Sequence, residues 1–347
     1  MVTMPDISIA IYTLTRHGLR LAKRLATALG ATIYASHRHV DEKGIHGFTS
    51  LPELINTTFS RYDGHIFITA AGIAVRCIGP LLKSKDVDPA VVCMDQEGQF
   101  AVSLLSGHLG GANELAVRCA ECIGGHPVIT TATDSTGVPS MDMLAQARGL
   151  VIGNIDRIKT INGSLLDTTQ VQLFDPDDTL GLADNPRFTP VESPEDWKPE
   201  RPGVWVSFRT DCPDDAALRL YPRVLMLGVG CRRGVAEEEI TRHIHAVFDA
   251  AGLALQSVGG LASVTAKADE PGLLQAAERL NVTPEFFEKS HLETIDTPNP
   301  SGTVLRRMGV ESVSEAAAII LSDNGKLLVE KTKTKTVTLA VARRRPC

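Results

Sequence analysis

The amino-acid sequence predicts an α/β fold with two domains, each containing a mainly parallel sheet. Its 347 residues exceed what a single hydrophobic core normally holds. In both halves, short apolar runs that indicate strands alternate with stretches of helical periodicity, an order typical of βαβ units. The connection between the halves is rich in Pro and Asp, which favours irregular structure. We therefore expect two Rossmann-like α/β domains joined by an irregular segment.

Residues 1–174 form the predicted N-terminal domain. Its first helix is expected to end at Gly30, because glycine is common just past the end of a helix. An Asp-Gln-Glu-Gly turn at 95–98 separates two of the apolar runs. We expect strands at 7–12, 32–35, 65–69, 90–94, 100–104 and 127–131, and helices at 19–29, 71–82 and 110–123.

Residues 175–221 form the predicted linker between the domains. Residues 175–215 alone contain 11 acidic and 4 basic side chains, whereas the rest of the chain is nearly balanced in charge. Seven prolines also fall in this stretch. Proline cannot donate to a sheet, so we expect irregular structure with one strand at 204–208.

Residues 222–347 form the predicted C-terminal domain. A helix at 236–250 opens with three glutamates, which complement the positive end of a helix dipole. The last two strands are separated by a polar Lys/Thr turn and favour a hairpin. We expect strands at 224–227, 253–261, 326–331 and 336–342, and further helices at 271–280 and 313–321.

The composition excludes several classes of function. With 43% hydrophobic and 22% charged residues the chain is typical of a globular protein, and no apolar run reaches the roughly 20 residues of a membrane helix. The first 18 residues lack the features of a signal peptide, so we expect a cytoplasmic protein without a membrane partner. There is no basic patch with interleaved aromatic residues, which argues against nucleic acid.

Seven cysteines, an odd number, lie within apolar stretches and indicate reduced thiols rather than disulfides. Cys119 and Cys122 have C-x-x-C spacing but lie within a helical pattern without a second pair. We therefore do not interpret them as a metal or redox site.

Polar residues gather after three strands of the predicted N-terminal sheet. Because ligands of open α/β sheets bind beyond the carboxyl ends of strands, we expect these groups to converge at one edge. Each alone could equally cap the next helix. The candidates are Arg76 after the first of these strands; Ser106, His108, Gly110, Gly111, Asn113 and Glu114 after the second; and Thr131 and Asp134 after the third.

Two other interpretations of these residues are weaker. A Ser106–His108–Asp134 triad is conceivable, but the G-x-S-x-G turn that usually presents such a serine does not occur here. Metal ligation by His108, Glu114 and Asp134 would follow no recognised spacing.

In the second half, a glycine loop follows the first strand. Gly228 and Gly230 resemble the start of a G-x-G-x-x-G nucleotide fingerprint, but Gly234 comes one residue too late. Adjacent Arg232 and Arg233 instead offer bidentate binding of carboxylates. Further charged groups near strand ends are Lys267 and Glu270, and Lys331, Lys333 and Lys335 crowd the last hairpin, where they are either simply solvated or edge a cleft.

Five long strings carry more information than composition or periodicity. They are TAAGIAVRCIGPLLKSKDVDPAVVCMDQEGQFAVSLLSGHLGGANELA, VITTATD, LGVGCRRGV, SVTAKADEPGL and GVESVSEAAAI. Together they resemble the CbiG family of cobalamin-biosynthesis proteins, over about residues 60–175 and 223–342. The last three strings resemble the family's second domain, which also occurs as a separate protein in the aerobic pathway.

This resemblance implies a hydrolase of the anaerobic branch of cobalamin synthesis. Such an enzyme opens the δ-lactone of cobalt-precorrin-5A and releases acetaldehyde to give cobalt-precorrin-5B. The substrate is large and flat and carries many carboxylates, which fits glycine loops and arginines. Cobalt enters with the substrate, so no cofactor or metal site of the protein's own is expected.

The reaction implies roles for the candidates. Lactone hydrolysis needs a base to activate water and a donor for the tetrahedral oxyanion. We predict His108 as the base, oriented or replaced by Glu114, with Asp134 as a further candidate. Oxyanion donors are Ser106 and the Gly110 and Gly111 amides. The other candidates would bind substrate: Arg76, Asn113, Thr131, Arg232, Arg233, Lys267 and Glu270.

Two rival functions stay open at this point. One is a tetrapyrrole-binding protein that transfers intermediates without hydrolysing them. The other is a nucleotide-dependent oxidoreductase, which the glycine loop at 228–234 suggests. The partners left open are a second copy of the chain and neighbouring enzymes of the pathway.

Overall fold

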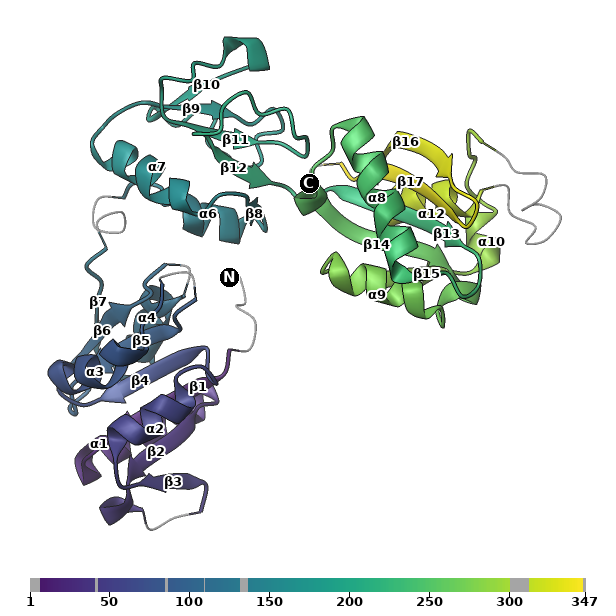
Figure 1. Cartoon of the computed structure of the whole chain (residues 1–347). Helices are drawn as coiled ribbons and strands as arrows, with labels where there is room; N and C mark the ends of the chain where they lie inside the picture. The colour runs from purple at the N-terminus through teal and green to yellow at the C-terminus, as the bar shows by residue number, and fades with distance from the viewer. Residues whose placement is uncertain are drawn as a thin grey trace. The chain divides into compact units, whose positions relative to one another are not determined.

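The computed structural model describes residues 7–40, 43–84, 87–108, 110–131, 137–299 and 312–345. The chain divides into two units, Met1–Met143 and Leu144–Cys347, and its described part contains three sheets (Figure 1). Most strand pairs in these sheets are parallel, which confirms the predicted α/β fold. Within the described ranges, no helix has the length and apolar character needed to cross a membrane.

The first unit contains a seven-stranded sheet in the order β3-β2-β1-β4-β5-β6-β7. Neighbouring strands are parallel except for β5 and β6, which are joined by the predicted turn and run antiparallel. Its strands are β1 (Ile9–Thr13), β2 (Thr32–Ser36), β3 (Ile45–Phe48), β4 (Gly64–Ile68), β5 (Ala90–Met94), β6 (Phe100–Leu105) and β7 (His126–Val128).

Helices cover both faces of this sheet and make it a three-layer domain (Figure 1). The sheet residues alternate between two apolar clusters, one beneath α1 and α4 and one beneath α2 and α3. The C-terminal cap of α1 is Gly30, in the left-handed conformation at φ 69°, as predicted. The helices are α1 (Arg16–Leu29), α2 (Leu51–Thr58), α3 (Ala71–Ile78) and α4 (Ala112–Ile123), and α6 (Met141–Ala147) follows them in the chain.

The segment predicted to be a linker instead contributes three strands to a second sheet. This sheet has the order β10-β9-β11-β12-β8, and α7 (Asp156–Leu166) belongs to the same region. An aromatic cluster explains the difference, because the rings of Phe174 and Trp205 stack at 3.9 Å and Trp197 packs edge-on against Trp205. Pro190 ends the edge strand β10, where a missing N–H is tolerated. The strands are β8 (Val151–Ile152), β9 (Val171–Phe174), β10 (Phe188–Pro190), β11 (Gly203–Val206) and β12 (Leu218–Tyr221).

The third sheet has the order β15-β14-β13-β17-β16. Strands β13, β14 and β15 are parallel, and β16 and β17 form the predicted hairpin. Helices α8 and α9 cover one face, and α12 covers the other. The elements are β13 (Leu225–Cys231), α8 (Glu237–Ala251), β14 (Val258–Val264), α9 (Pro271–Arg279), β15 (Pro284–Phe287), α10 (Lys289–Leu292), α12 (Val313–Leu321), β16 (Lys326–Lys333) and β17 (Val337–Arg343).

Candidate functional site

A tight glycine loop joins β6 to α4 in the first unit. Ser106 has φ 56°, a conformation that costs energy for a residue with a side chain. A Cβ atom on Gly110 would lie 2.3 Å from the Cβ of Ser106, and one on Gly107 would lie 2.7 Å from Oδ1 of Asn113. The glycines are therefore needed for the loop to fold back on itself. This loop holds most of the predicted catalytic residues.

Asn113 links the loop by hydrogen bonds to β6 and to the segment that follows β7. Its Oδ1 accepts a hydrogen bond from the Ser103 hydroxyl at 2.6 Å, and its Nδ2 donates to the Thr131 hydroxyl at 3.0 Å. Its backbone N–H also donates to the carbonyl of Gly107 at 3.0 Å. The predicted ligand-binding residues Asn113 and Thr131 are thus brought together, and they hold the His108 loop in place.

His108 is paired with a buried carboxylate. Its Nδ1 lies 3.3 Å from Oδ2 of Asp142 and 3.2 Å from the hydroxyl of Ser140, which in turn donates to the other carboxylate oxygen. The side chain of Asp142 is only 5% exposed and that of His108 17%. A carboxylate at Nδ1 fixes the proton there in the neutral ring and makes Nε2 the basic nitrogen. The arrangement is that of a general base with its orienting acid.

The other catalytic candidates differ in whether their polar groups are already hydrogen-bonded within the protein. The Ser106 hydroxyl is buried and has no hydrogen-bond partner in the described ranges, which suits a donor kept for a ligand. The Gly111 amide donates to the His108 carbonyl at 2.8 Å and is therefore engaged rather than available for an oxyanion. Glu114 lies half-buried in the first turn of α4, while Asp142 occupies the orienting position predicted for it. Asp134 lies outside the described residues.

Arg76 and the His108 loop lie at opposite ends of the strands of this sheet. The prediction that three strand ends converge is therefore wrong. Strands β5 and β6 are antiparallel, with Met94 beside Ala101 and Val91 beside Leu105. The end of β6 therefore lies where β5 begins. Arg76 donates to the carbonyl of Gly72 at 3.1 Å within α3, the helix that follows the C-terminal end of β4.

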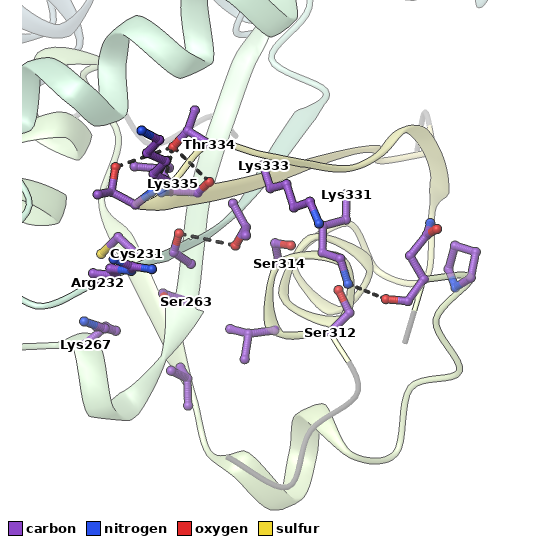
Figure 2. Close-up of a pocket in the computed structure, with 18 residues that line it drawn as sticks. Cys231, Arg232, Ser263, Lys267, Ser312, Ser314, Lys331, Lys333, Thr334 and Lys335 are labelled. Carbon is purple, nitrogen blue, oxygen red and sulfur yellow. Dashed lines mark hydrogen bonds between the residues drawn. The ribbon is translucent and has the colours of Figure 1, made fainter. Parts of the chain in front are cut away.

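A second candidate site is a pocket of about 830 Å³ in the third sheet (Figure 2). It lies where β13 and β14 end, between the β16–β17 hairpin and the start of α12. Its described lining contains five cationic side chains and no carboxylate. The cations are Arg232, Lys267, Lys331, Lys333 and Lys335.

The predicted substrate-binding residues of the C-terminal domain differ in their exposure and in their partners. Arg232 is exposed and lines the pocket, as does Lys267. Arg233 lies outside the lining and forms an ion pair with Asp269 at 3.0 Å, which lowers the pKa of that carboxyl. Glu270 is buried and accepts from the Gly234 N–H at 2.6 Å and from Lys267 at 3.2 Å. The Gly234 N–H, followed by Lys267, holds the pKa of Glu270 below its usual value, so this carboxylate stabilises the loop.

Two site residues, Asp142 and Ser314, were not among the predicted ones. Asp142 follows His108 by 34 positions and belongs to no recognised motif, so only the fold reveals it. The three hairpin lysines were noted in the sequence, and the structure places all of them in the pocket lining, in favour of the cleft interpretation. Ser314, at the start of α12, also lines the pocket.

The described cysteines and metal-ligating residues form no further centre. All six described cysteines are free thiols, and burial raises the pKa of Cys119 to about 12. Within the described ranges, no three His, Cys, Asp or Glu side chains are close enough together to hold a metal ion.

Comparisons with known proteins cover nearly the whole chain. Three family models match: "Cobalamin synthesis G N-terminal" at residues 53–134, "Cobalamin biosynthesis central region" at 139–222 and "Cobalamin synthesis G C-terminus" at 225–342. The central match includes residues 175–221, the predicted linker.

Full-length relatives give the same result. The cobalt-precorrin-5A hydrolase of Salmonella typhimurium is 36% identical over 99% of this chain and 100% of its own, and that of Priestia megaterium is 30% identical over 96% and 94%. A crystal structure of a cobalamin biosynthesis protein G homolog from Sulfolobus solfataricus is 23% identical, covers 98% of both chains and has a TM-score of 0.37. The chain therefore belongs to the CbiG family of cobalamin-biosynthesis proteins.

Proposed function

We propose that this chain is a hydrolase that opens the δ-lactone of cobalt-precorrin-5A and releases acetaldehyde to give cobalt-precorrin-5B. Its full-length relatives carry the name of this activity. The observation that supports the hydrolytic step in this chain is the pairing of His108 with the buried Asp142, on a loop that also carries the unpartnered Ser106 hydroxyl.

In the first step, Nε2 of His108 takes a proton from water as the water oxygen attacks the lactone carbonyl. Asp142 stabilises the imidazolium that forms, and the Ser106 hydroxyl donates to the developing oxyanion. Collapse of the tetrahedral intermediate breaks the ester C–O bond and leaves a carboxylate and a secondary alcohol. His108 returns its proton to the departing oxygen.

In the second step, the alcohol loses its proton and its C–O bond becomes the carbonyl of acetaldehyde. The electron pair of the broken carbon–carbon bond passes into the conjugated ring, which later takes up a proton. No outside oxidant or reductant is needed. The cobalt ion belongs to the substrate, and the proposal requires no cofactor bound by the protein itself. We place the reaction in the cytoplasm, where free thiols such as the six described here persist.

The experiment is a coupled assay of acetaldehyde. Purified protein is incubated with cobalt-precorrin-5A, and acetaldehyde is measured by alcohol dehydrogenase and NADH oxidation. We expect His108→Ala to lower kcat by about 10²–10⁴-fold while the corrinoid still binds. His17→Ala is the matched control, because His17 also pairs with a carboxylate, Glu97 at 3.3 Å, but at an exposed surface of the same unit.

The outcomes distinguish a hydrolase from a tetrapyrrole-binding protein that only transfers intermediates. Acetaldehyde release by the wild type and the control, but not by His108→Ala, supports the proposal. Tight binding of the corrinoid by the wild type without acetaldehyde release would instead show a binding and transfer protein. A near-normal kcat in His108→Ala would remove His108 from the role of base.

A further inference from the structure

The cationic pocket of the third sheet carries charge that the protein itself does not neutralise. Lys267 is paired with Glu270, and the Lys331 ammonium donates to the backbone carbonyl of Asn299 (Figure 2). Arg232, Lys333 and Lys335 form no ion pair with any carboxylate in the described part of the chain. Three unpaired cations around one hollow create a positive potential that favours an anion.

The start of α12 adds hydrogen-bond donors to this pocket. Val313 and Ser314 are the first residues of this nine-residue helix, and both line the hollow. The first N–H groups of a helix have no partner within the helix and carry its positive dipole end. The one carboxylate in the first turn, Glu315, lies outside the lining. It accepts instead from the Lys331 N–H at 2.9 Å and from the Asn299 amide at 2.8 Å.

Ser314 gives independent support for a ligand here. Its residue is only 1% exposed, and its hydroxyl has no hydrogen-bond partner in the described ranges. A buried hydroxyl without a partner costs free energy unless something outside the chain completes it. The side chain lies among the residues that line the pocket, between the helix and the lysines of the hairpin (Figure 2).

We propose that this pocket is an oxyanion site that holds carboxylate side chains of the tetrapyrrole, with Ser314 and the α12 N-terminus as donors and Arg232, Lys333 and Lys335 as counter-charges. The choice of carboxylate as the ligand rests on the proposed function, because a corrinoid carries acetate and propionate groups. The described lining contains no histidine and no carboxylate. We therefore assign binding to this pocket and the chemistry to the His108 loop.

The test is a fluorescence titration of the full chain with uroporphyrin I, a stable tetrapyrrole with eight carboxylates. We expect Lys333→Ala/Lys335→Ala to raise the Kd about tenfold or more, with a weaker salt dependence than the wild type. Lys289→Ala/Lys326→Ala is the matched control, because it removes the same charge from the same unit outside the pocket and should leave the Kd within about twofold.

Ser314→Ala distinguishes a ligand donor from a structural residue. If the hydroxyl serves a ligand, we expect the Kd to rise about five- to tenfold, while the midpoint of thermal unfolding is unchanged or higher because an unpartnered buried hydroxyl is removed. An unchanged Kd in both Ser314→Ala and the double lysine variant would overturn the proposal. So would binding of inorganic phosphate at this site tighter than that of uroporphyrin, which would indicate a phosphate site.

These readouts are independent of acetaldehyde release. If the pocket variants leave the Kd for uroporphyrin unchanged while His108-dependent acetaldehyde is still formed, only the proposed binding site is refuted. If the pocket variants raise the Kd but the wild type releases no acetaldehyde, only the proposed activity is refuted.

Discussion

Replacing Asp142 by Asn tests whether the His108 loop performs general base catalysis. The substitution keeps the size of the side chain and removes the charge that lies 3.3 Å from Nδ1 of His108. A charge-assisted hydrogen bond is worth about 1.5–3 kcal/mol, and it matters most when the imidazole carries the proton taken from water. At 1.36 kcal/mol per factor of ten, kcat should fall by about 10- to 150-fold. KM should change little, because Asp142 is buried behind the histidine.

A double variant separates positioning from a merely structural role. Because Asp142 is expected to act through His108, Asp142→Asn should lower kcat little further in a His108→Ala background. Asp63→Asn is the matched control in the same unit, because its carboxylate binds Ser8 instead of a histidine. A kcat close to that of the wild type, or an equal fold loss of kcat with and without His108, would contradict the assignment of Asp142.

Three further predictions concern stability and binding. Burial lowers the pKa of His65 from 6.5 to about 4, so the unfolded chain takes up its proton first as pH falls. In denaturant titrations, the free energy of unfolding should therefore fall by about 3 kcal/mol more in the wild type than in His65→Gln between pH 6.5 and below pH 4, because the carboxylates protonate in both proteins. Gly228→Ala should cost about 3 kcal/mol or more in thermal unfolding, because its Cβ would lie 1.8 Å from a backbone oxygen of α12, whereas Gly163→Ala, with open space around it, should not destabilise. Arg232→Ala should weaken uroporphyrin binding about tenfold, whereas Arg233→Ala, outside the pocket lining, should change it less than about twofold.

Strong periodicity made much of the fold predictable from sequence. The predicted strand at 90–94 and helix at 313–321 match β5 and α12 residue for residue. Residues 90–94 are a continuous apolar run, and residues 316–321 are another with polar residues on both sides. The central sheet was not predictable in this way. Its strands are two to four residues long, and its stability rests on contacts such as that between Phe174 and Trp205, which are 31 positions apart. Proline content gives no information about such contacts.

The site was predictable where neighbours in sequence are neighbours in space. The glycine loop around His108 was found because its residues are contiguous. The expectation that Arg76 would join it failed because one antiparallel pair, β5 with β6, reverses the direction of the sheet. A strand's direction depends on its pairing partner, and no single stretch of sequence encodes it. Asp142 was missed for the same reason, since its proximity to His108 depends on the path of the chain between them.

The glycines at 228 and 230 show how a familiar pattern can arise from a different physical need. In a dinucleotide fold such glycines let a cofactor approach the helix that follows the strand. Here a Cβ atom on Gly228 would collide with the backbone of α12, and one on Gly230 would lie 2.5 Å from the Thr338 hydroxyl of β17. The absence of a side chain at these glycines thus lets α12, about 85 positions later in the chain, and β17 of the hairpin pack directly against β13. This packing places the α12 N-terminus beside the ends of β13 and β14, with the hairpin lysines around it. The observation that suggested a nucleotide-dependent oxidoreductase is therefore accounted for by the assembly of the cationic pocket.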